Sequence, residues 1–466
     1  MERRRLVTPL VVLCAAQAIL QLDYSIVNLA LKTIQSEVGF STAGLQWVAT
    51  SYALTFGSLL MLGGRLGDWI GRRRLLIAGL LVFAAASLAC GLSQSAGTLV
   101  AARFVQGAGA AMIAPTVLAM LTAIYEGPER SQALGAWAAS VAVGGTAGVI
   151  VGGLLTEYLG WRSIFLVNLP VIAVLVVLAR RVLPDGRRDR NVALDPLGAA
   201  LITLAIAALI LGLTNGEQHG FGGAGSWVPL ALSALLGAAF FANEGRVAEP
   251  MISFRFLAAP LRRISTLTMF LVGGITTAYT FFIALTMQHI LGFTPAEAGL
   301  LIVPSGLMMF GTSMLLAHRL IARLGLKRVL ILGLVTTGVA MLAFSQIDAG
   351  TSYVTGVLPG LLLNSFGMGL LFPAISIGIT GNVTPRERGI AGGLVPTAQQ
   401  VGAAVVLAVL ATLAAAVSKQ DGGSLAAGYR VGFLGALALV VACAALVAAT
   451  SFREVEAGPV PASAPS

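Results

Sequence analysis

The feature that most constrains this chain is a series of apolar runs, each about long enough to cross a lipid bilayer as a helix. Runs at 75–93, 164–179, 197–213 and 433–449 contain no charged residue. A spanning helix needs about 20 apolar residues, and these runs lack the period-two alternation of barrel strands. Charged residues make up 10% of the sequence, against roughly 25% in average soluble proteins. The sequence therefore predicts an all-α integral membrane protein.

Apolar runs between charged segments predict fourteen transmembrane helices. We place them at 7–31, 45–63, 75–93, 98–120, 133–155, 164–182, 195–214, 226–243, 266–290, 299–317, 328–346, 353–379, 390–416 and 429–451. The first run follows MERRR and is similar to the start of a signal peptide. Because no small-residue cleavage site closes it and many spans follow, we expect it to remain as the first helix.

The distribution of basic residues predicts the orientation, because cytoplasmic loops carry an excess of Lys and Arg. With the N-terminus in the cytoplasm, most of the 29 lysines and arginines fall inside. The exceptions are Lys32, Arg162, Lys419 and Arg430 outside, and Arg103 within a span. The net charge of +10 is thus a topology signal and not a nucleic-acid-binding surface. We expect a multi-pass protein of the cell membrane with both termini in the cytoplasm.

Two parts of the chain repeat one another. The matched pairs include Arg65/Arg319, Gly71/Gly325, Arg74/Arg328, Gly79/Gly333, Gly135/Gly393 and Gly144/Gly402. Repeated halves are typical of carriers that alternate access to a site near the membrane midplane. We predict an N-terminal six-helix bundle (1–183), two linker transmembrane helices with their flanks (184–263), a C-terminal six-helix bundle (264–452) and a disordered cytoplasmic tail (453–466).

The loop between the second and third spans carries a motif of glycine and charged residues. It consists of Gly64, Asp68, Gly71, Arg72, Arg73 and Arg74. Glycine permits a tight turn, an acid pairs well with the positive charge of a helix N-terminus, and arginines suit the anionic inner leaflet. The motif resembles the cytoplasmic signature loop of the major facilitator superfamily. The resemblance implies a conformational latch, complete only in the first half because Ala322 stands where the second copy would need an acid.

The fifth span is rich in glycine, with Gly135, Gly144, Gly148, Gly152 and Gly153. This spacing resembles the antiporter motif of drug exporters in the superfamily, although Val149 stands where that motif has proline. Close helix packing also explains the glycines, and the missing proline leaves uniport and symport open. The segments LDYSIVNLAL (22–31), RFVQG (103–107) and WRSIFLVNLP (161–170) resemble signatures of the fourteen-helix drug/proton antiporter family. That resemblance implies the major facilitator fold with two extra central helices.

Asp23 and Arg103 are the charged residues that the predicted spans place deep in the membrane. An ionisable side chain in hydrocarbon costs at least a few kcal/mol and usually faces an interior cavity. Because its surroundings decide whether a carboxyl holds a proton, Asp23 is suited to carry one, with Glu157 a weaker second candidate. The resemblance also links Arg103 to proton coupling. A purely structural ion pair is the alternative. A single deep carboxylate favours neutral or monovalent substrates.

Aromatic and amide side chains are candidates for a substrate site, since adaptable surfaces suit promiscuous binding. The candidates are Tyr24, Asn28, Trp47, Gln106, Phe281 and Gln399. Each of them can equally pack against lipid or a neighbouring helix. We expect no metal site, because the three histidines are far apart in the sequence.

The sequence favours a secondary transporter over an enzyme, an ATP-driven pump or a channel. It contains no Walker loop, no His/Cys/Asp cluster and no repeated filter sequence. We predict proton-coupled export of lipophilic or monocationic drugs by alternating access. The transporter is expected to be a monomer that contacts membrane lipids and uses the proton gradient without a cofactor. The alternatives are a same-fold carrier of a lipid precursor, siderophore or peptide, and a non-transporting receptor.

Overall fold

The computed structural model describes residues 2–40, 45, 47–185, 195–247, 254–381, 383–384, 387–420 and 424–450. Within these ranges every regular element is a helix. The membrane-length segments are α1 (Glu2–Val38), α3 (Trp47–Ile70), α4 (Arg72–Gly91), α5 (Ala96–Ile124), α6 (Gly127–Leu159), α7 with α8 (Ser163–Leu166, Asn168–Val182), α9 (Pro196–His219), α10 (Ala224–Glu244), α12 with η1 (Pro260–Leu285, Thr286–Ile290), α13 with η2 and α14 (Pro295–Gly311, Thr312–Leu316, Ala317–Leu324), α15 (Leu326–Phe344), η3 with α16 (Tyr353–Val357, Leu358–Thr380), α17 (Arg388–Gln420) and α18 (Leu425–Ala449). A short helix, α11 (Phe254–Ala258), precedes α12.

These segments confirm the fourteen predicted spans, and each extends beyond its prediction at one end or both. In the described part of the chain, 13 helices are long and apolar enough to cross a membrane. The fourteenth is α3, which has 24 residues but carries Thr, Ser, Tyr and Gly in its first turns. Much of α3 is buried against neighbouring helices, including Ser51, Tyr52 and Gly57. A helix with little lipid contact tolerates these less apolar residues.

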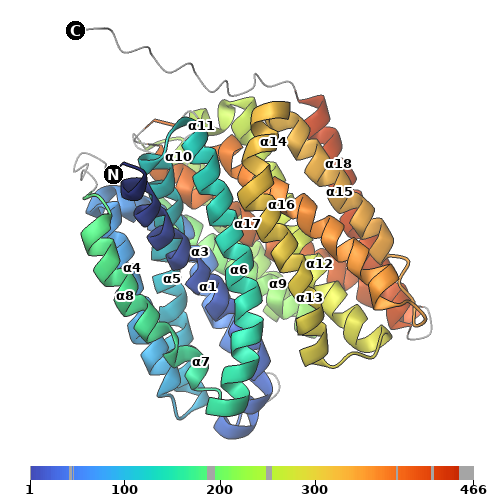
Figure 1. Cartoon of the computed structure of the whole chain (residues 1–466). Coiled ribbons are helices and arrows are strands. Elements are labelled where there is room, and N and C mark those ends of the chain that lie inside the picture. Colours follow the sequence, from blue (N-terminus) through green and yellow to red (C-terminus); the bar gives the residue numbers. More distant parts are fainter. Residues whose placement is uncertain are drawn as a thin grey trace, which may run out of the picture.

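The helices form two groups joined by a helical hairpin (Figure 1). In the first group α1 packs on α6, and α5 packs on α3 and α4; in the second, α12 packs on α17, and α15 packs on α16 and α18. The hairpin of α9 and α10 contacts both groups, because α9 packs against α3 and α17. The predicted linker and tail lie partly or wholly outside the described residues, at 186–194, 248–253 and 451–466.

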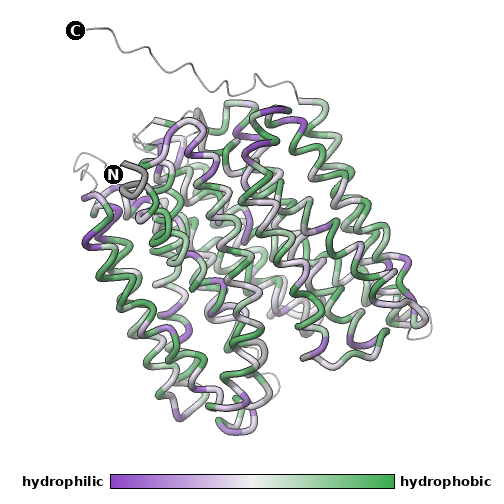
Figure 2. Tube along the Cα trace, viewed as in Figure 1, coloured by the Kyte–Doolittle hydropathy of each residue, from purple (hydrophilic) through white to green (hydrophobic). Residues whose placement is uncertain are grey.

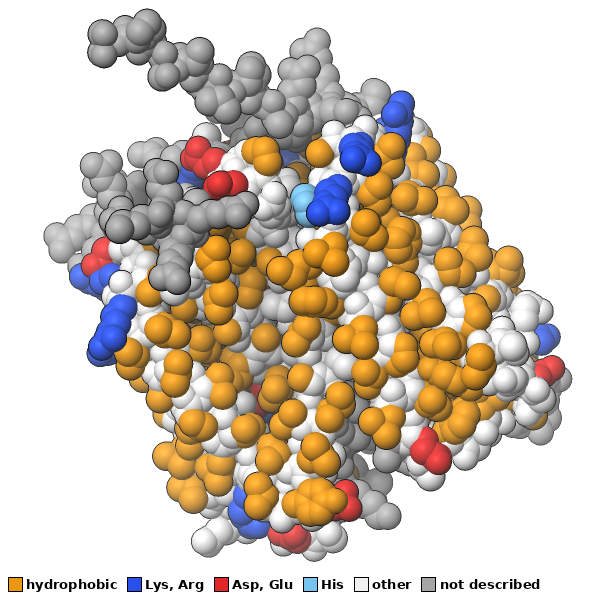
Figure 3. Space-filling view, viewed as in Figure 1, with side chains coloured by type: hydrophobic (Ala, Val, Ile, Leu, Met, Phe, Trp, Pro, Cys, Tyr) orange, Lys and Arg blue, Asp and Glu red, His pale blue; other side chains and the backbone are white. Residues whose placement is uncertain are grey.

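One end of the molecule carries the beginning of α1, α4, α12 and α15, and we call it the basic end. Arginine and lysine side chains gather there in Figure 3, and hydrophilic residues lie mainly at helix ends in Figure 2. The groups meet where α3 and α5 contact α17, and where α6 contacts α13, α14 and α16. Near the basic end the backbone of Gly135 lies against that of Ser313. Toward the opposite end α6 and α13 separate (Figure 1).

The repeat in the sequence corresponds to a repeat in the structure. Gly71 and Gly325 have φ values of +102° and +81°, and each stands directly before the equivalent helix, α4 or α15. Positive φ is strained for residues with a Cβ, which explains glycine at both turns. Gly144 and Gly402 also correspond, because each faces the backbone of the first helix of its own group, at Ala18 and Phe270. The two helix groups are therefore built on the same plan.

Candidate functional site

A buried ion pair joins α1 to α5. Arg103 Nη1 lies 2.7 Å from Asp23 Oδ2, and the two side chains are 1% and 0% exposed. Removing two charges from water is expensive, so such a pair persists only when further hydrogen bonds satisfy both ends. The sequence singled out both residues, and the structure brings them into direct contact.

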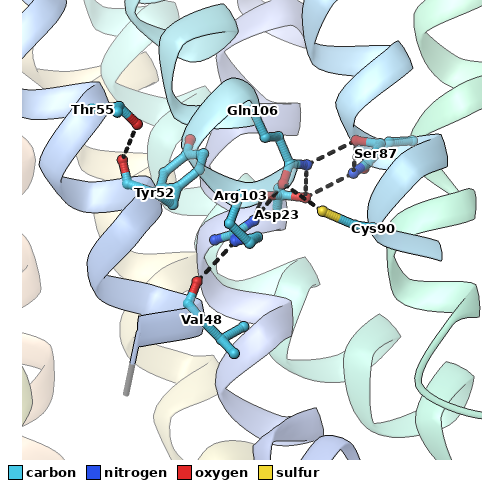
Figure 4. Close-up of polar contacts among 9 residues, drawn as sticks. Asp23, Val48, Tyr52, Thr55, Ser87, Cys90, Arg103 and Gln106 are labelled. Carbon is cyan, nitrogen blue, oxygen red and sulfur yellow. Dashed lines mark hydrogen bonds and ion pairs between the residues drawn. The ribbon is translucent and has the colours of Figure 1, made fainter. Parts of the chain in front are cut away.

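The second oxygen of the Asp23 carboxylate also accepts hydrogen bonds. Gln106 Nε2 and Asn168 Nδ2 each donate to Asp23 Oδ1 at 2.8 Å. Gln106 also donates to Ser87 Oγ at 2.8 Å and accepts from Arg103 at 2.6 Å. Figure 4 shows these contacts converging on the carboxylate. Buried charged groups need hydrogen-bond partners, and three side chains supply them to the two oxygens of this carboxylate.

Helix periodicity and helix capping place these groups. Arg103 and Gln106 are three residues apart, so they share one face of α5. α5 begins at a capping box in which Ser95 and Thr98 satisfy each other's backbone. Arg103 Nε also donates to the Val48 carbonyl of α3 at 3.0 Å. The arginine thus fixes α1, α3 and α5 at one point.

An aromatic ring covers the arginine. The Tyr52 ring centroid lies 4.4 Å from the guanidinium carbon of Arg103, a distance that gives a favourable cation–π contact. Tyr24 lies next to Tyr52, with ring centroids 6.2 Å apart. Tyr24 is 44% exposed, whereas Tyr52 is buried. The ion pair therefore lies beneath one aromatic layer.

The glycines of α6 pack on α1 beside the ion pair. Gly144, Gly148 and Gly152 face Ala18, Leu22 and Ile26 in turn. A Cβ on Gly148 would lie 2.7 Å from the Leu22 carbonyl oxygen, and one on Gly152 would lie 2.6 Å from Ile26 Cγ1. Three glycines at i, i+4 and i+8 make one flat helix face, which lets α1 approach closely. Asp23 lies within the stretch of α1 that this face supports.

The signature loop connects the two helix groups at the basic end. Asp68 Oδ1 pairs with Arg72 at 2.8 Å, and its other oxygen lies directly against Gly389 of α17. A Cβ on Gly64 would lie 2.7 Å from the Gly389 carbonyl oxygen. Backbone of α3 and α17 is thus in close contact here. Of the predicted latch residues, Gly64 and Asp68 lie at the boundary between the groups, whereas Arg73 contacts the end of α8.

Comparison with known proteins decides the family. The Major Facilitator Superfamily matches residues 13–260 and 265–466. The chain belongs to the major facilitator superfamily. The cephamycin export protein CmcT of Amycolatopsis lactamdurans is 38% identical over 443 residues, covering 94% of this chain and 91% of that protein. The puromycin resistance protein pur8 of Streptomyces alboniger is 38% identical over 414 residues, covering 87% and 81%.

Solved structures agree with the fold. The human organic anion transporter MFSD10 superposes with a TM-score of 0.66 at 19% identity, covering 95% of this chain and 99% of that chain. The predicted family and fold are therefore confirmed. As a member of the superfamily, this chain is a multi-pass membrane transporter.

The predicted substrate residues of this superfamily member are found in different surroundings. Tyr24 and Trp47 are partly exposed near the ion pair, whereas Phe281 and Gln399 belong to the second helix group and are half-buried. Gln106 is fully buried and its amide is used within the hydrogen-bond network. This placement favours a role in holding Asp23 over direct contact with a substrate. The side chains of Asn28 and Val149 lie outside the described residues.

Two further predicted residues have distinct positions. Gly135 faces Ser313 of η2 and not α1, and Gly153 has no neighbour within 4 Å of a Cβ built on it. The five glycines of the predicted motif therefore do not form one contact surface. Within the described ranges, no group of three or more His, Cys, Asp or Glu side chains is placed to hold a metal ion.

Sequence reasoning missed Asn168, which completes the contacts of Asp23. It lies in the WRSIFLVNLP segment, at the first residue of α8. The available signal was a lone amide inside an otherwise apolar run. An uncharged amide costs less to bury than a charge, so it did not stand out.

Proposed function

We propose that this transporter exports small antibiotic-like molecules across the cell membrane in exchange for protons. The observation that carries the proposal is the fully buried Asp23 carboxylate, held by three side-chain donors beside a closely packed helix pair. The relatives named for cephamycin export and puromycin resistance supply the substrate class. No cofactor and no catalytic step form part of the proposal.

Asp23 carries the proton in this account. The proton binds when a conformational change moves the surrounding donors away from the carboxylate. Asn168 suits both states, because its amide can donate to the anion through nitrogen and accept from the neutral carboxyl through oxygen. Its oxygen has no hydrogen-bond partner among the described residues, so rotation of the amide would break no other bond of that oxygen.

Arg103 keeps the site closed until the carboxylate is neutralised. When Asp23 gains a proton, the attraction across the 2.7 Å contact falls, and Arg103 keeps its bonds to Gln106 and to the Val48 carbonyl. α1 is then free to move relative to α5. Because α1 packs closely on the glycine face of α6, the two helices move together. Protonation therefore changes the position of the first helix group relative to the second.

The proposal also includes the orientation of the transporter in the membrane and the side on which it is closed. The basic end faces the cytoplasm, since basic loops remain on that side, and both termini lie there. The contact of Asp68 with α17 then closes the cytoplasmic side, while α6 and α13 separate toward the outside (Figure 1). The transporter works as a monomer, because each chain contains both helix groups and the ion pair.

Export from cells and vesicles tests the proposal. An antibiotic-sensitive bacterial host without its own exporters would express the chain, and resistance to cephamycin, puromycin and unrelated lipophilic cations would be measured. Inverted membrane vesicles should then accumulate the same compounds only with a proton gradient, and a protonophore should abolish the uptake. No resistance and no gradient-driven uptake of any compound would favour a carrier of a physiological substrate.

A further inference from the structure

A groove at the basic end of the first helix group combines positive charge with an apolar wall. α4 begins with three arginines and α8 ends with two, and these helices contact each other. Between them lies a cavity of about 500 Å³. Its lining consists of Arg73, Arg74, Ile77, Ala78, Leu81 and Arg180.

The charge in the groove is only partly balanced. Arg73 pairs with Asp185 at 2.5 Å and donates to the Leu183 carbonyl at 3.1 Å. In the part of the chain that the structure describes, no ion pair involves Arg74 or Arg180. Both side chains are exposed.

The arginines at the start of α4 add to the positive electrostatic potential in the groove. The first turn of α4 contains no acidic residue, and the N-terminus of a helix already presents positive charge from its backbone N–H groups. Cations are unfavourable at that end unless an anion is close. A bound anion between α4 and α8 would therefore be attracted by the helix end and by two arginines together.

The rest of the lining is apolar, so it does not contribute to binding a small free anion. Ile77, Ala78 and Leu81 continue along α4 from the arginines, and Leu81 is 49% exposed. In Figure 3 basic side chains at the left edge of the molecule lie directly above an apolar surface. Both helices are long and apolar enough to cross a membrane. Their arginine-bearing ends thus lie at the depth of lipid headgroups, with the apolar wall at the depth of acyl chains.

We propose that this groove binds an anionic phospholipid. Its phosphate lies between Arg74 and Arg180, and an acyl chain covers Ile77, Ala78 and Leu81. The groove shares Arg73 and Arg74 with the predicted latch, and Arg72, which bonds Asp68 at 2.8 Å, precedes them on α4. The proposal does not depend on which molecule is transported.

Native mass spectrometry of the purified full chain tests the site. The protein in detergent is offered equal amounts of phosphatidylglycerol and phosphatidylcholine. The double variant Arg74→Gln, Arg180→Gln is expected to bind phosphatidylglycerol about tenfold more weakly than the wild type, because each basic residue contributes several-fold to affinity for anionic lipid. The matched control is Arg319→Gln, Arg323→Gln, which removes the same charge from exposed side chains of α14. This control should keep the preference of the wild type.

Equal loss in the two double variants, or no preference for phosphatidylglycerol in the wild type, would overturn the proposal. Ala78→Trp provides a second test that leaves the charge unchanged. It fills the apolar wall, so it should weaken phosphatidylglycerol binding while the thermal unfolding midpoint without added lipid stays the same. Inorganic phosphate and glycerophosphoglycerol at millimolar concentration should not displace the lipid. Displacement by either would show a site for free anions and contradict the assignment.

Discussion

Three side chains from two helices, α5 and α8, donate hydrogen bonds to one buried carboxylate of α1. Asp23 receives hydrogen bonds from Arg103, Gln106 and Asn168. Among the described residues, no other acidic side chain is bonded to these three. Hydrogen bonds to a charged group are stronger than neutral ones, so these donors hold the carboxylate in place between α1, α5 and α8. In the proposed mechanism the proton-carrying step therefore depends on the partners as much as on Asp23.

Replacing Asn168 with leucine, which has a similar size but no N–H, is expected to lower the thermal stability of the purified protein. The buried carboxylate of Asp23 then loses one of its donors, and losing a hydrogen bond to a charged group costs about 1.5–3 kcal/mol. The midpoint of thermal unfolding in detergent measures the change.

Thr122→Val is the matched control for this variant. Thr122 is buried, and its hydroxyl donates only to the Ala119 carbonyl of its own helix at 3.0 Å. Its unfolding midpoint should fall by less than that of Asn168→Leu, because no charged group loses a donor. A wild-type midpoint in Asn168→Leu would show that Asn168 adds nothing to the hydrogen bonding of Asp23.

The ion pair could be predicted from the sequence, whereas its hydrogen-bond partners could not. Charge in hydrocarbon is costly, so Asp23 and Arg103 stood out within apolar runs. Gln106 and Asn168 carry no charge, and the direction of an amide depends on which helices surround it. Arg65 and Glu244 are buried too, but they lie toward helix ends, where charged residues are normally expected to be exposed.

At the scale of elements, glycine positions determine how close two helices approach. Hydrophobicity predicted where α1 and α6 lie along the chain, but it contained no information about which glycines face each other. In the structure Gly144, Gly148 and Gly152 contact α1, Gly135 contacts η2, and Gly153 faces open space. The predicted span at 45–63 corresponds to α3, and burial among helices reduces its need for apolar residues.

Gly148→Ala is expected to lower stability, and Gly153→Ala is expected to be neutral or slightly stabilising. The new Cβ at Gly148 would lie 2.7 Å from the Leu22 carbonyl and 2.9 Å from Ser25 Cβ, and overpacking of this kind costs about 1–3 kcal/mol. At Gly153 the new methyl group meets nothing, and alanine favours helix by up to about 1 kcal/mol. Thermal unfolding in detergent compares the two variants. Equal midpoints would contradict the close contact of α1 with α6.

At the scale of the whole molecule, two similar helix groups meet along α3, α5 and α17 on one side and along α6 and α13 on another. The repeat in the sequence predicted two halves because turn glycines and arginines recur in both. It could not predict that α9 would pack against both α3 and α17. The sequence of an apolar linker helix does not indicate which helices it contacts. The hairpin therefore covers one of the two boundaries between the groups.

The proposed orientation predicts which side of the membrane each end of α10 faces. Gly222→Cys and Arg246→Cys place exposed thiols just before and just after this helix. In intact cells a membrane-impermeant maleimide should label the first and spare the second, and permeabilised cells should show both. Of the three native cysteines, Cys90 and Cys443 are buried and Cys14 is half-buried, so labelling of the chain without a new cysteine sets the background. Labelling of Arg246→Cys alone in intact cells would reverse the orientation.

The most direct test of proton coupling compares two kinds of transport in Asp23→Asn. In proteoliposomes with a compound that the wild type exports, exchange across the membrane without a gradient requires substrate binding and conformational change, whereas uphill accumulation also requires proton movement. Asparagine keeps the shape of Asp23 but cannot ionise, so the variant should retain exchange and lose gradient-driven accumulation, while Asp23→Glu should recover part of it. Gradient-driven accumulation at the wild-type level in Asp23→Asn would contradict the assignment of Asp23 as the proton carrier.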